Sequence, residues 1–321
     1  MLEIRDLVKS YGSVRALKGL SLQVEDGSLF GLMGQNGAGK TTLLRIAAGL
    51  LAPDRGQISA DGLDLLQEPA EARFLIGFVP DTFGAYENLT VLQYLEFYAS
   101  AYRYRGRNAR VRCEELLDRV GMAELSGRET AALSRGMQQR LSIARALIHD
   151  PKYLLLDEPT SGLDPGSRFS VRELLGELCE SGKTIVLSSH VLSELSEICT
   201  DIGILEDGRV KVTGEVSEIL AKIEHSNPLK ISVVSGEEIA MGIFRRNPYV
   251  RSVMRSGKTF SLEFEGGGEE EAALLRDLIE AEIPVNGFMR EPGSLESFFL
   301  KMTSDNRERV ILDNDDEESD L

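Results

Sequence analysis

A glycine-rich stretch followed by a lysine and two threonines offers the clearest chemistry in this sequence. It reads Gly34-Gln35-Asn36-Gly37-Ala38-Gly39-Lys40-Thr41-Thr42 and fits the P-loop pattern G-x-x-x-x-G-K-[ST]. Glycines allow backbone N–H groups to approach a phosphate closely. Lys40 adds a charge suited to the β- and γ-phosphates, and the Thr41 hydroxyl suits Mg²⁺. The pattern therefore favours a nucleotide phosphate site over an ordinary glycine-rich turn.

A pair of carboxylates follows a short apolar run later in the chain. Tyr153–Leu156 reads as a buried strand, and Asp157 and Glu158 stand directly after it. Asp157 suits the Mg²⁺ shell, and Glu158 could polarise a water for attack on a γ-phosphate. A lone Asp-Glu pair at a strand end is commonly two surface acids. Following a P-loop, the same pair is more simply explained as catalytic.

The segments around these residues predict where they meet. Ser28–Met33 reads as a buried strand before the P-loop, and Thr41 to Leu50 reads as a helix after it. Lys183–Ser188 reads as another strand, with His190 just past its end. Ligands of open α/β sheets bind at the carboxyl ends of the strands. We therefore expect Asp157, Glu158 and His190 near the P-loop, although a lone histidine at a helix start is more often a cap.

Two further features give weaker evidence for a nucleotide site when each is taken alone. Ser134 is a good N-cap for a helix running to about His149, and Gly136 leaves backbone exposed in its first turn. A helix start of this kind can bind a phosphate or can simply be a capped helix. Tyr11 precedes a turn at Gly12, between the predicted strands Leu2–Val8 and Val14–Val24. It could stack on a base or be a half-buried tyrosine.

An arginine cluster lies between two predicted helices. The first helix is capped by Thr90 and runs to about Tyr104, after a predicted strand Phe74–Val79, and the second covers Ala109–Val120. The cluster comprises Arg103, Arg105, Arg107, Arg110 and Arg112. A solvated helical face explains it, as would a surface near anionic lipid headgroups or an acidic partner loop.

Composition limits the classes of function. The chain has 321 residues, of which 42% are hydrophobic, so it can bury a large core and form two domains. Its net charge of −16 argues against a general nucleic-acid binder. The apolar runs are far too short for a membrane span, and the first residues lack signal-peptide character. The widely spaced Cys113, Cys179 and Cys199 suit a reducing cytosol.

In their order and spacing, these motifs resemble the ATP-binding cassette (ABC) of ABC transporters over roughly residues 1–224. The resemblance implies a P-loop NTPase α/β fold, with a RecA-like core and antiparallel and helical subdomains, that hydrolyses ATP with Mg²⁺. It makes Tyr11 the adenine-stacking aromatic, and Thr41 and Asp157 the residues at Mg²⁺. Glu158 becomes the catalytic carboxylate and His190 the switch histidine. Two cassettes would pair head to tail, so that Ser134 and Gly136 reach the partner's γ-phosphate and Asp164 lies at the dimer interface.

Two residues depart from the family pattern. Asp81 stands where the family usually has a glutamine that meets Mg²⁺ and the attacking water. The signature reads Leu133-Ser134-Arg135-Gly136-Met137 where the family commonly has L-S-G-G-Q. The form found here is similar to that of cassettes paired with ABC-2-type export permeases.

The end of the chain predicts a second, smaller domain. A linker at 225–228 precedes a β-α-β-β-α-β order over residues 229–303, which suggests a ferredoxin-like α+β domain. It closes with a predicted helix at Ser294–Lys301 and resembles the C-terminal extension of export cassettes. Residues 304–321 form an acidic tail that is most simply disordered.

These inferences predict an ATPase subunit that powers a separate integral membrane permease, most simply an exporter of drugs, antibiotics, lipids or polysaccharides. It would work as a dimer with a second copy or a related cassette, on the inner face of the cell membrane, with no nucleic-acid partner. Two alternatives stay open. One is a soluble ABC ATPase acting on ribosomes or DNA, and the other is a low-turnover regulatory cassette. The transported substrate is selected by the permease.

Overall fold

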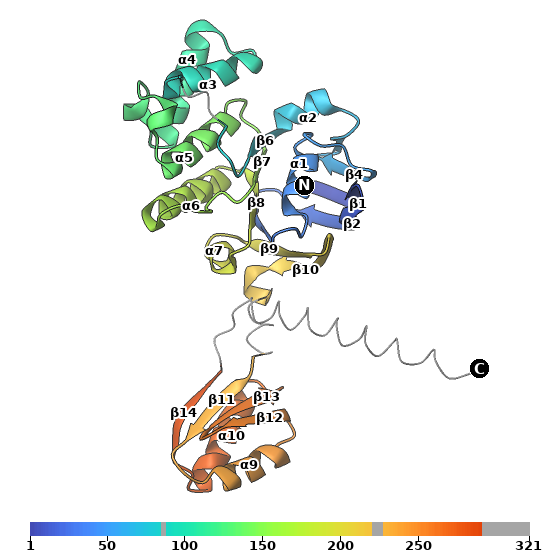
Figure 1. The fold of residues 1–321 in the computed structure, drawn as a ribbon, viewed down its shortest axis with the longest axis vertical. Coiled ribbons are helices and arrows are strands. Elements are labelled where there is room, and N and C mark those ends of the chain that lie inside the picture. Colours follow the sequence, from blue (N-terminus) through green and yellow to red (C-terminus); the bar gives the residue numbers. More distant parts are fainter. Residues whose placement is uncertain (85–87, 220–226, 291–321) are drawn as a thin grey trace, which may run out of the picture. The chain divides into compact units, whose positions relative to one another are not determined.

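The computed structural model describes residues 1–84, 88–219 and 227–290, and the chain divides into two compact units, Met1–Val216 and Ser217–Leu321 (Figure 1). The predicted cassette end at residue 224 falls among residues 220–226, outside the described part. The predicted helix Ser294–Lys301 and the acidic tail also lie outside it. Among the described residues, no helix combines the length and the apolar character needed to cross a membrane.

A six-stranded sheet organises the first unit, in the order β10-β9-β3-β8-β7-β6. Its bounds are β3 Leu29–Met33, β6 Ile76–Val79, β7 Tyr153–Leu156, β8 Thr184–Ser189, β9 Asp201–Glu206 and β10 Arg209–Glu215. All pairs are parallel except that of β10 with β9. Every residue of β3, β7 and β8 is buried, as expected for parallel strands covered on both faces. Their carboxyl ends meet at one edge, which brings the segments that follow them together.

A smaller antiparallel sheet has the order β2-β1-β4-β5. Its bounds are β1 Leu2–Tyr11, β2 Val14–Val24, β4 Arg55–Ala60 and β5 Leu63–Asp64. Tyr11 pairs with Val14 across a two-residue turn, in which Gly12 adopts a φ of 59°. Such tight hairpin turns require positive φ, which glycine adopts at little cost. The predicted antiparallel region around this turn is confirmed.

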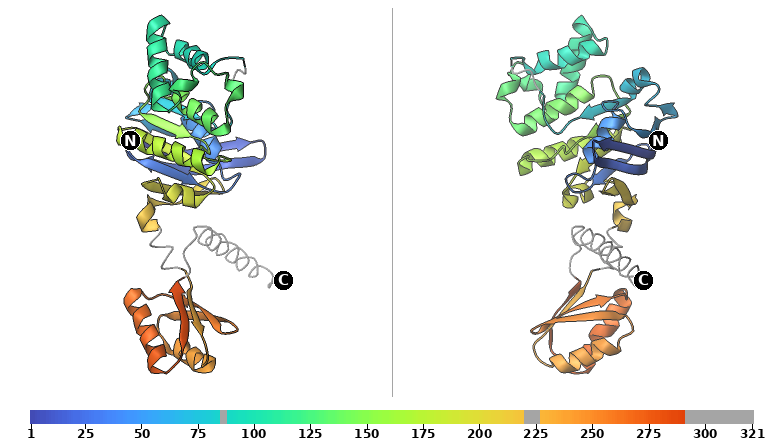
Figure 2. Two further views of the ribbon diagram at one scale, coloured as in Figure 1. Left: turned by 90° about the vertical axis from the view of Figure 1, so that its left-hand side faces the viewer. Right: turned by 45° about the vertical axis from the view of Figure 1, so that its right-hand side comes forward.

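Helix α1 (Lys40–Ala47) lies between the two sheets of this unit (Figure 2). Leu43 and Leu44 of the helix share one core with Ile4 of β1 and Phe30 of β3. Helix α6 (Pro165–Glu180) covers the opposite face of the parallel sheet and buries Val171, Leu174, Leu175 and Leu178. The helix that carries the end of the P-loop is thus fixed from both sides by apolar packing.

Helices α3 (Val91–Ala101), α4 (Gly106–Arg119) and α5 (Arg135–Ala146) form a helical lobe. As predicted, Thr90 caps α3, and its hydroxyl accepts the Gln93 N–H while the Gln93 side chain accepts the Thr90 N–H. Two 3₁₀ turns, Ala123–Leu125 and Thr130–Ala132, connect α4 to α5.

The predicted strand Phe74–Val79 is wrong in its first two residues. Phe74 and Leu75 end helix α2 (Pro69–Leu75), and β6 begins only at Ile76. Pro69 fixes the first helical position, which favours a helix there. An apolar run alone cannot mark the change, because helix and strand both bury such residues.

Part of the arginine cluster is engaged within the protein. Arg112 donates to the Leu147 and Ile148 carbonyl oxygens at 2.9 and 3.1 Å, beyond the end of α5. Arg110 pairs with Glu114 one turn along α4, at 2.9 Å. The backbone contacts favour a structural role for Arg112, whereas Arg110 remains 63% exposed and its surface pair leaves either interpretation of that residue open.

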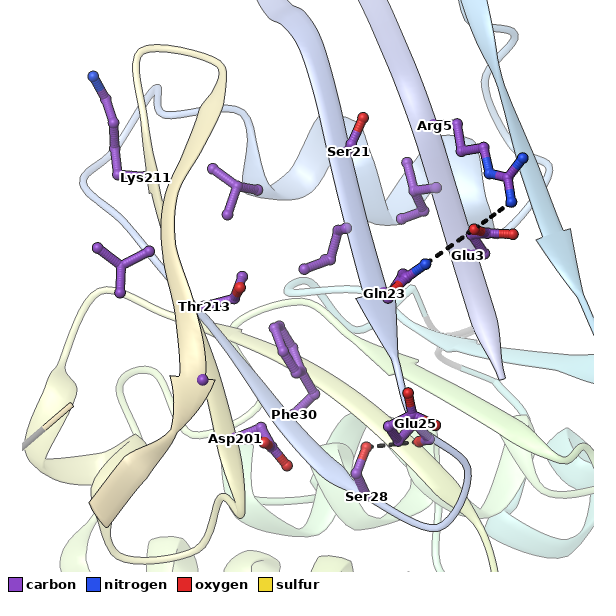
Figure 3. A pocket seen from close by; sticks show the side chains of 15 residues that line it. Glu3, Arg5, Ser21, Gln23, Glu25, Ser28, Phe30, Asp201, Lys211 and Thr213 are labelled. Atoms are coloured by element: carbon purple, nitrogen blue, oxygen red, sulfur yellow. Dashed lines mark hydrogen bonds and ion pairs between the residues drawn. The ribbon is translucent and has the colours of Figure 1, made fainter. Parts of the chain in front are cut away.

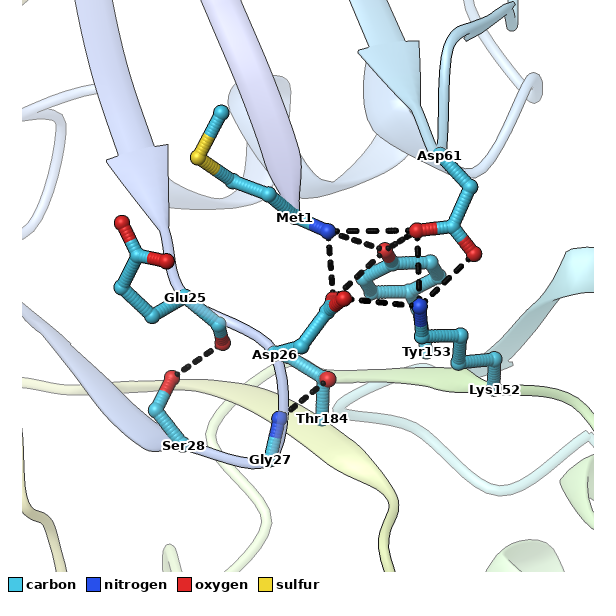
Figure 4. Close-up of polar contacts among 9 residues, drawn as sticks. All are labelled: Met1, Glu25, Asp26, Gly27, Ser28, Asp61, Lys152, Tyr153 and Thr184. Carbon is cyan, nitrogen blue, oxygen red and sulfur yellow. Dashed lines mark hydrogen bonds and ion pairs between the residues drawn. The ribbon is translucent and has the colours of Figure 1, made fainter.

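A polar network ties the starts of several strands together (Figure 4). Lys152 lies 2.8 Å from Asp26 and 2.7 Å from Asp61, and the Tyr153 hydroxyl donates to both carboxylates. The Met1 amine also contacts these groups. Hydrogen bonds from Lys152 are the largest cause of the lowered pKa of both aspartates. The network joins the two sheets at the edge away from the P-loop.

The second unit consists of β11 (Leu229–Val233), α9 (Glu237–Arg246), β12 (Val250–Ser256), β13 (Thr259–Phe264), α10 (Gly268–Glu280) and β14 (Val285–Arg290). Its sheet has the order β12-β13-β11-β14, and all three strand pairs are antiparallel. One face of the sheet packs on the helices, and Ile231 of β11 and Phe260 of β13 share a core with Phe244 of α9. Alternate residues of a strand point to the other face, as Lys230 does between the buried Leu229 and Ile231 of β11.

Candidate functional site

The P-loop connects β3 to α1, and its glycines are required by close backbone packing. Gly39 has a φ of 110°, and a Cβ there would lie 2.7 Å from the Ala16 carbonyl oxygen. A Cβ on Gly34 would lie 2.5 Å from the Leu205 carbonyl oxygen. Both distances are too short for any side chain, so the loop geometry depends on these two residues. The turn leaves the N-terminus of α1 open to an anion.

Lys40 is buried at the centre of the site, with 6% of its surface exposed. Its ammonium group donates to the Gly34 carbonyl oxygen at 2.6 Å and to that of Gln35 at 3.4 Å. It also lies 3.3 Å from Glu158 Oε1. A buried charge needs such partners. They orient the ammonium group toward the loop, where it could bind a phosphate oxygen.

A serine links the two predicted acids, and one of these acids contacts the P-loop threonine. Asp157 Oδ1 accepts the Thr41 hydroxyl at 3.0 Å and the Ser188 hydroxyl at 2.9 Å. The Ser188 oxygen in turn accepts the backbone N–H of Glu158 at 2.9 Å. Ser188 is fully buried near the end of β8, next to β7. The network fixes the Asp157 carboxylate beside Thr41 and the Glu158 backbone beside β8.

Glu158 and His190 contact each other directly. His190 Nδ1 lies 2.9 Å from Glu158 Oε2. An ionised carboxylate can only accept a hydrogen bond, so Nδ1 carries the proton in this contact. Glu158 has a φ of 48°, which is unusual for a residue with a side chain and sets the direction in which the carboxylate leaves the strand.

These residues line one open cleft of about 590 Å³. The predicted site residues in its lining are Gln35, Asn36, Gly37, Gly39, Lys40, Thr41, Thr42, Asp81, Asp157, Glu158 and His190. Gly34 and Ala38 contribute the backbone of the same loop. The cleft thus combines a P-loop, a buried cation, three carboxylates and an imidazole at the carboxyl ends of the strands.

Besides Gly34 and Ala38 of the loop, four predicted site residues lie outside the lining of this cleft. Tyr11 is 49% exposed at the end of β1, with the Lys9 ammonium 5.9 Å from its ring centroid. Ser134 caps α5 by accepting the Met137 N–H, and Gly136 is buried in the first turn. Asp164 caps α6, and hydrogen bonds from the Ser167 hydroxyl and N–H lower its pKa. Within one chain, Ser134 and Asp164 act as helix caps.

Sequence reasoning missed Ser188 and the residues Val14, Ala16 and Arg45 in the cleft lining. A polar residue near the end of an apolar strand was the available signal for Ser188. No local signal marks Val14, Ala16 or Arg45, because only the folded chain brings β2 and α1 to the cleft.

A second pocket, of about 640 Å³, lies between β2 and β10 (Figure 3). It is found at the amino ends of β3 and β9, marked by Ser28 and Asp201. Three of its polar side chains bond to one another, since Glu3 accepts hydrogen bonds from Arg5 and Gln23. Ligands of α/β sheets bind at the opposite edge, so the P-loop cleft is the candidate site.

The donors in the P-loop cleft fit a hard cation shared with a phosphate. The Thr41 hydroxyl and the Asp157 carboxylate are 3.0 Å apart, and both are oxygen donors. Within the described residues, no group of three or more histidine, cysteine, aspartate or glutamate side chains forms a closed metal cage. Mg²⁺ typically binds through one or two protein oxygens together with phosphates and waters, which this arrangement allows.

Comparisons with known proteins agree with this geometry. A family model described as ABC transporter matches residues 17–161. The linearmycin resistance ATP-binding protein LnrL of Bacillus subtilis is 30% identical over 94% of this chain and 98% of its own length. The ABC transporter ATP-binding protein NatA of B. subtilis is 39% identical over 69% of this chain and 90% of its own length. The Nod factor export ATP-binding protein I of Ralstonia nicotianae is 33% identical over 94% of each.

A solved structure supports the same assignment for the first unit. It is a dimeric, post-hydrolysis state of the ATP-binding cassette MJ0796 bound to ADP and Pi. The likeness has a TM-score of 0.61 at 31% identity and covers 67% of this chain and 99% of that one. The chain therefore belongs to the ABC transporter family, as an ATP-binding protein with the ABC cassette fold.

Proposed function

We propose that this chain is the ATPase subunit of an ABC-2-type exporter and powers a separate membrane permease. The arrangement that carries the proposal is the cleft in which Lys40, Asp157, Glu158 and His190 converge on the P-loop. The printed names of relatives include linearmycin resistance and Nod factor export, which favours export of a drug, antibiotic, lipid or polysaccharide. The Ser-Arg-Gly-Met signature agrees with this class.

Each residue of the cleft has its own role in ATP hydrolysis. The P-loop N–H groups and Lys40 bind the phosphates and offset the charge that develops on the transferred group. Glu158 accepts a hydrogen bond from the attacking water and orients it toward the γ-phosphorus. His190 holds the Glu158 carboxylate through Nδ1 and presents its Nε2 edge to the γ-phosphate. Thr41 and Asp157 would hold Mg²⁺, which neutralises phosphate charge.

Ser134, Gly136 and Asp164 act across a head-to-tail dimer in this proposal. They lie outside the cleft lining of their own chain, as residues that complete a partner's site must. Ser134 and the first turn of α5 present backbone N–H groups at a helix N-terminus, which suits the γ-phosphate held by a second copy or a related cassette. Tyr11 is placed at the adenine by the family resemblance.

Outside the catalytic cleft, we assign residues 229–303 to a ferredoxin-like accessory domain and 304–321 to an acidic tail. The strand order β12-β13-β11-β14, with two helices in a β-α-β-β-α-β sequence, supports the first assignment. The permease would hold the chain at the cytoplasmic face of the cell membrane, with no nucleic-acid partner.

Asp81 distinguishes this cleft from one with the usual glutamine. Its carboxylate joins Asp157 and Glu158 in the lining and adds negative charge beside the triphosphate. We therefore expect a steeper dependence of ATP turnover on Mg²⁺ than in an Asp81→Gln variant. Identical Mg²⁺ titrations for the two proteins would refute this role.

The direct test compares steady-state ATP turnover by the purified chain and its Glu158→Gln variant. We expect turnover by the wild type and a loss of about 10²–10⁴-fold in the variant, the range for removing a general base. Equal rates in the two proteins, or no turnover by either with a purified permease present, would overturn the proposed function.

A further inference from the structure

A buried acid follows His190 in the chain and lies outside the lining of the cleft. It is Glu194, in the short helix α7 (Leu192–Ser196), which begins two residues after His190. Only 8% of its surface is exposed. Buried carboxylates are rare unless they are paired, and the proposed chemistry gives Glu194 no role.

Glu194 has two polar partners, one from each neighbouring segment. Its Oε2 accepts the Thr160 hydroxyl at 2.5 Å, and Thr160 is itself only 3% exposed. Its Oε1 lies 3.1 Å from Arg168 Nε in the first turn of α6. The carboxylate thus joins α7 to the segment between β7 and α6.

These contacts and the contact between Glu158 and His190 join the same two segments of the chain at two points. Thr160 follows Glu158 by two residues, and Glu194 follows His190 by four. Glu158 and His190 meet at 2.9 Å at one point, and Thr160 and Glu194 meet at 2.5 Å at the other. Each pair therefore limits the freedom of the other. Movement of α7 away from Thr160 would carry His190 away from the Glu158 carboxylate.

We propose that Glu194 is a positioning residue which, through Thr160 and Arg168, holds His190 against Glu158. The inference rests on the proposed roles of Glu158 and His190. The same contacts connect His190 to the segment that ends at Asp164, the residue placed at the dimer interface. Misplacement of a catalytic group by about 1 Å can lower a rate by about 100-fold, so a remote contact of this kind can control turnover.

Substitutions at Thr160 test the contact with little change in volume. Thr160→Val removes the hydroxyl and keeps the shape, whereas Thr160→Ser restores it. Glu194→Gln keeps an oxygen that can accept from Thr160 but loses the charge that attracts Arg168. Glu197→Gln is the matched control, because Glu197 ends the same helix, pairs with Arg172 and has a side chain that is 58% exposed.

We expect Thr160→Val to lower kcat at least about tenfold, while the Kd for a non-hydrolysable ATP analogue changes by less than about twofold. Thr160→Ser and Glu197→Gln should retain wild-type kcat. A double variant, Thr160→Val with Glu194→Gln, should lose less than the sum of the two single losses, because both contacts belong to the same link between α7 and the segment after Glu158. Unchanged kcat in folded Thr160→Val, or a loss of kcat that Thr160→Ser does not recover, would overturn the proposal.

A second measurement reads the position of His190 without turnover. The chain has three histidines, so the His190 ring signals can be assigned in an NMR spectrum by comparison with His190→Ala. We expect Thr160→Val to move these signals in the direction seen for Glu158→Gln, and Glu197→Gln to leave them in place. His190 signals that are unchanged in Thr160→Val would contradict the inference. Absent ATP turnover in the wild type would contradict only the proposed function.

Discussion

The P-loop edge of the first unit buries charged and polar side chains, whereas the core of the second unit buries apolar ones. At the P-loop edge, Lys40, Asp157 and Ser188 are buried, with Ser188 bonded to Asp157 and Lys40 paired with Glu158. In the second unit, the core consists of apolar side chains such as Ile231, Phe244 and Phe260. Asn227 is the one buried polar side chain among the described residues of that unit.

This difference indicates where chemistry is located. Burial of a charge without partners costs several kcal/mol, and a network of partners is needed to offset it. Apolar packing provides stability without that cost. Buried charges gathered at the carboxyl ends of parallel strands therefore mark a site, whereas the second unit is built for packing. The predictions below separate the two regions by the property that each change should affect.

The largest expected effect on stability is in the second unit. Phe244 is fully buried, and its ring packs on Phe260 with centroids 5.1 Å apart. Phe244→Ala should lower the free energy of unfolding of this unit by about 3–5 kcal/mol, because it leaves a cavity. Chemical denaturation measures the loss, and kcat per folded molecule should not change. Met254→Ala, at a side chain 69% exposed, is the control.

A glycine of the P-loop should show the reverse pattern. Gly39→Ala adds a Cβ at a φ of 110° and 2.7 Å from the Ala16 carbonyl oxygen. The loop must then distort, so ATP affinity should fall at least about tenfold, with a smaller loss of stability of about 1–3 kcal/mol. Titration with labelled nucleotide measures the affinity. Gly176→Ala in α6, where no atom lies within 4 Å of the added Cβ, should retain wild-type affinity.

Ser188→Ala should affect both folding and catalysis. The change removes the hydroxyl that donates to Asp157 and accepts the Glu158 N–H. The free energy of unfolding should fall by about 1–3 kcal/mol. We expect kcat to fall about tenfold, as the Asp157 carboxylate loses a fixed direction. Ser170→Ala, at an exposed serine of α6, provides the comparison in the same assay. A Ser188→Ala enzyme with wild-type kcat would exclude this role.

The smallest expected effect concerns acid pH. The pKa values of Asp26 and Asp61 are lowered, chiefly by hydrogen bonds from Lys152. A group with a depressed pKa stabilises the fold above its ordinary pKa, near 3.8, and loses that contribution as the pH falls below it. Stability should therefore decline below about pH 4, and less steeply in Asp26→Asn. Thermal unfolding between pH 3 and pH 7 measures this, and parallel curves would contradict it.

The sequence predicted the chemistry of the cleft better than its internal contacts. The P-loop could be recognised because strand, glycines, lysine and helix are contiguous. Asp157 and His190 could be placed because each follows a buried strand, and parallel strands share a carboxyl edge. Phe74 and Leu75 were predicted as strand because an apolar run does not distinguish helix from strand. The contacts of Ser188 and Glu194 could not be predicted, since their partners are distant in sequence.

The central claim is that the cleft is an ATP site completed by a second cassette. Sedimentation of the Glu158→Gln variant with and without ATP and Mg²⁺ tests it most directly, because this variant should bind ATP without hydrolysing it. The account predicts a dimer with ATP and a monomer without it, and a weaker dimer when Ser134→Ala is added. A Glu158→Gln chain that remains monomeric at saturating ATP would contradict the account.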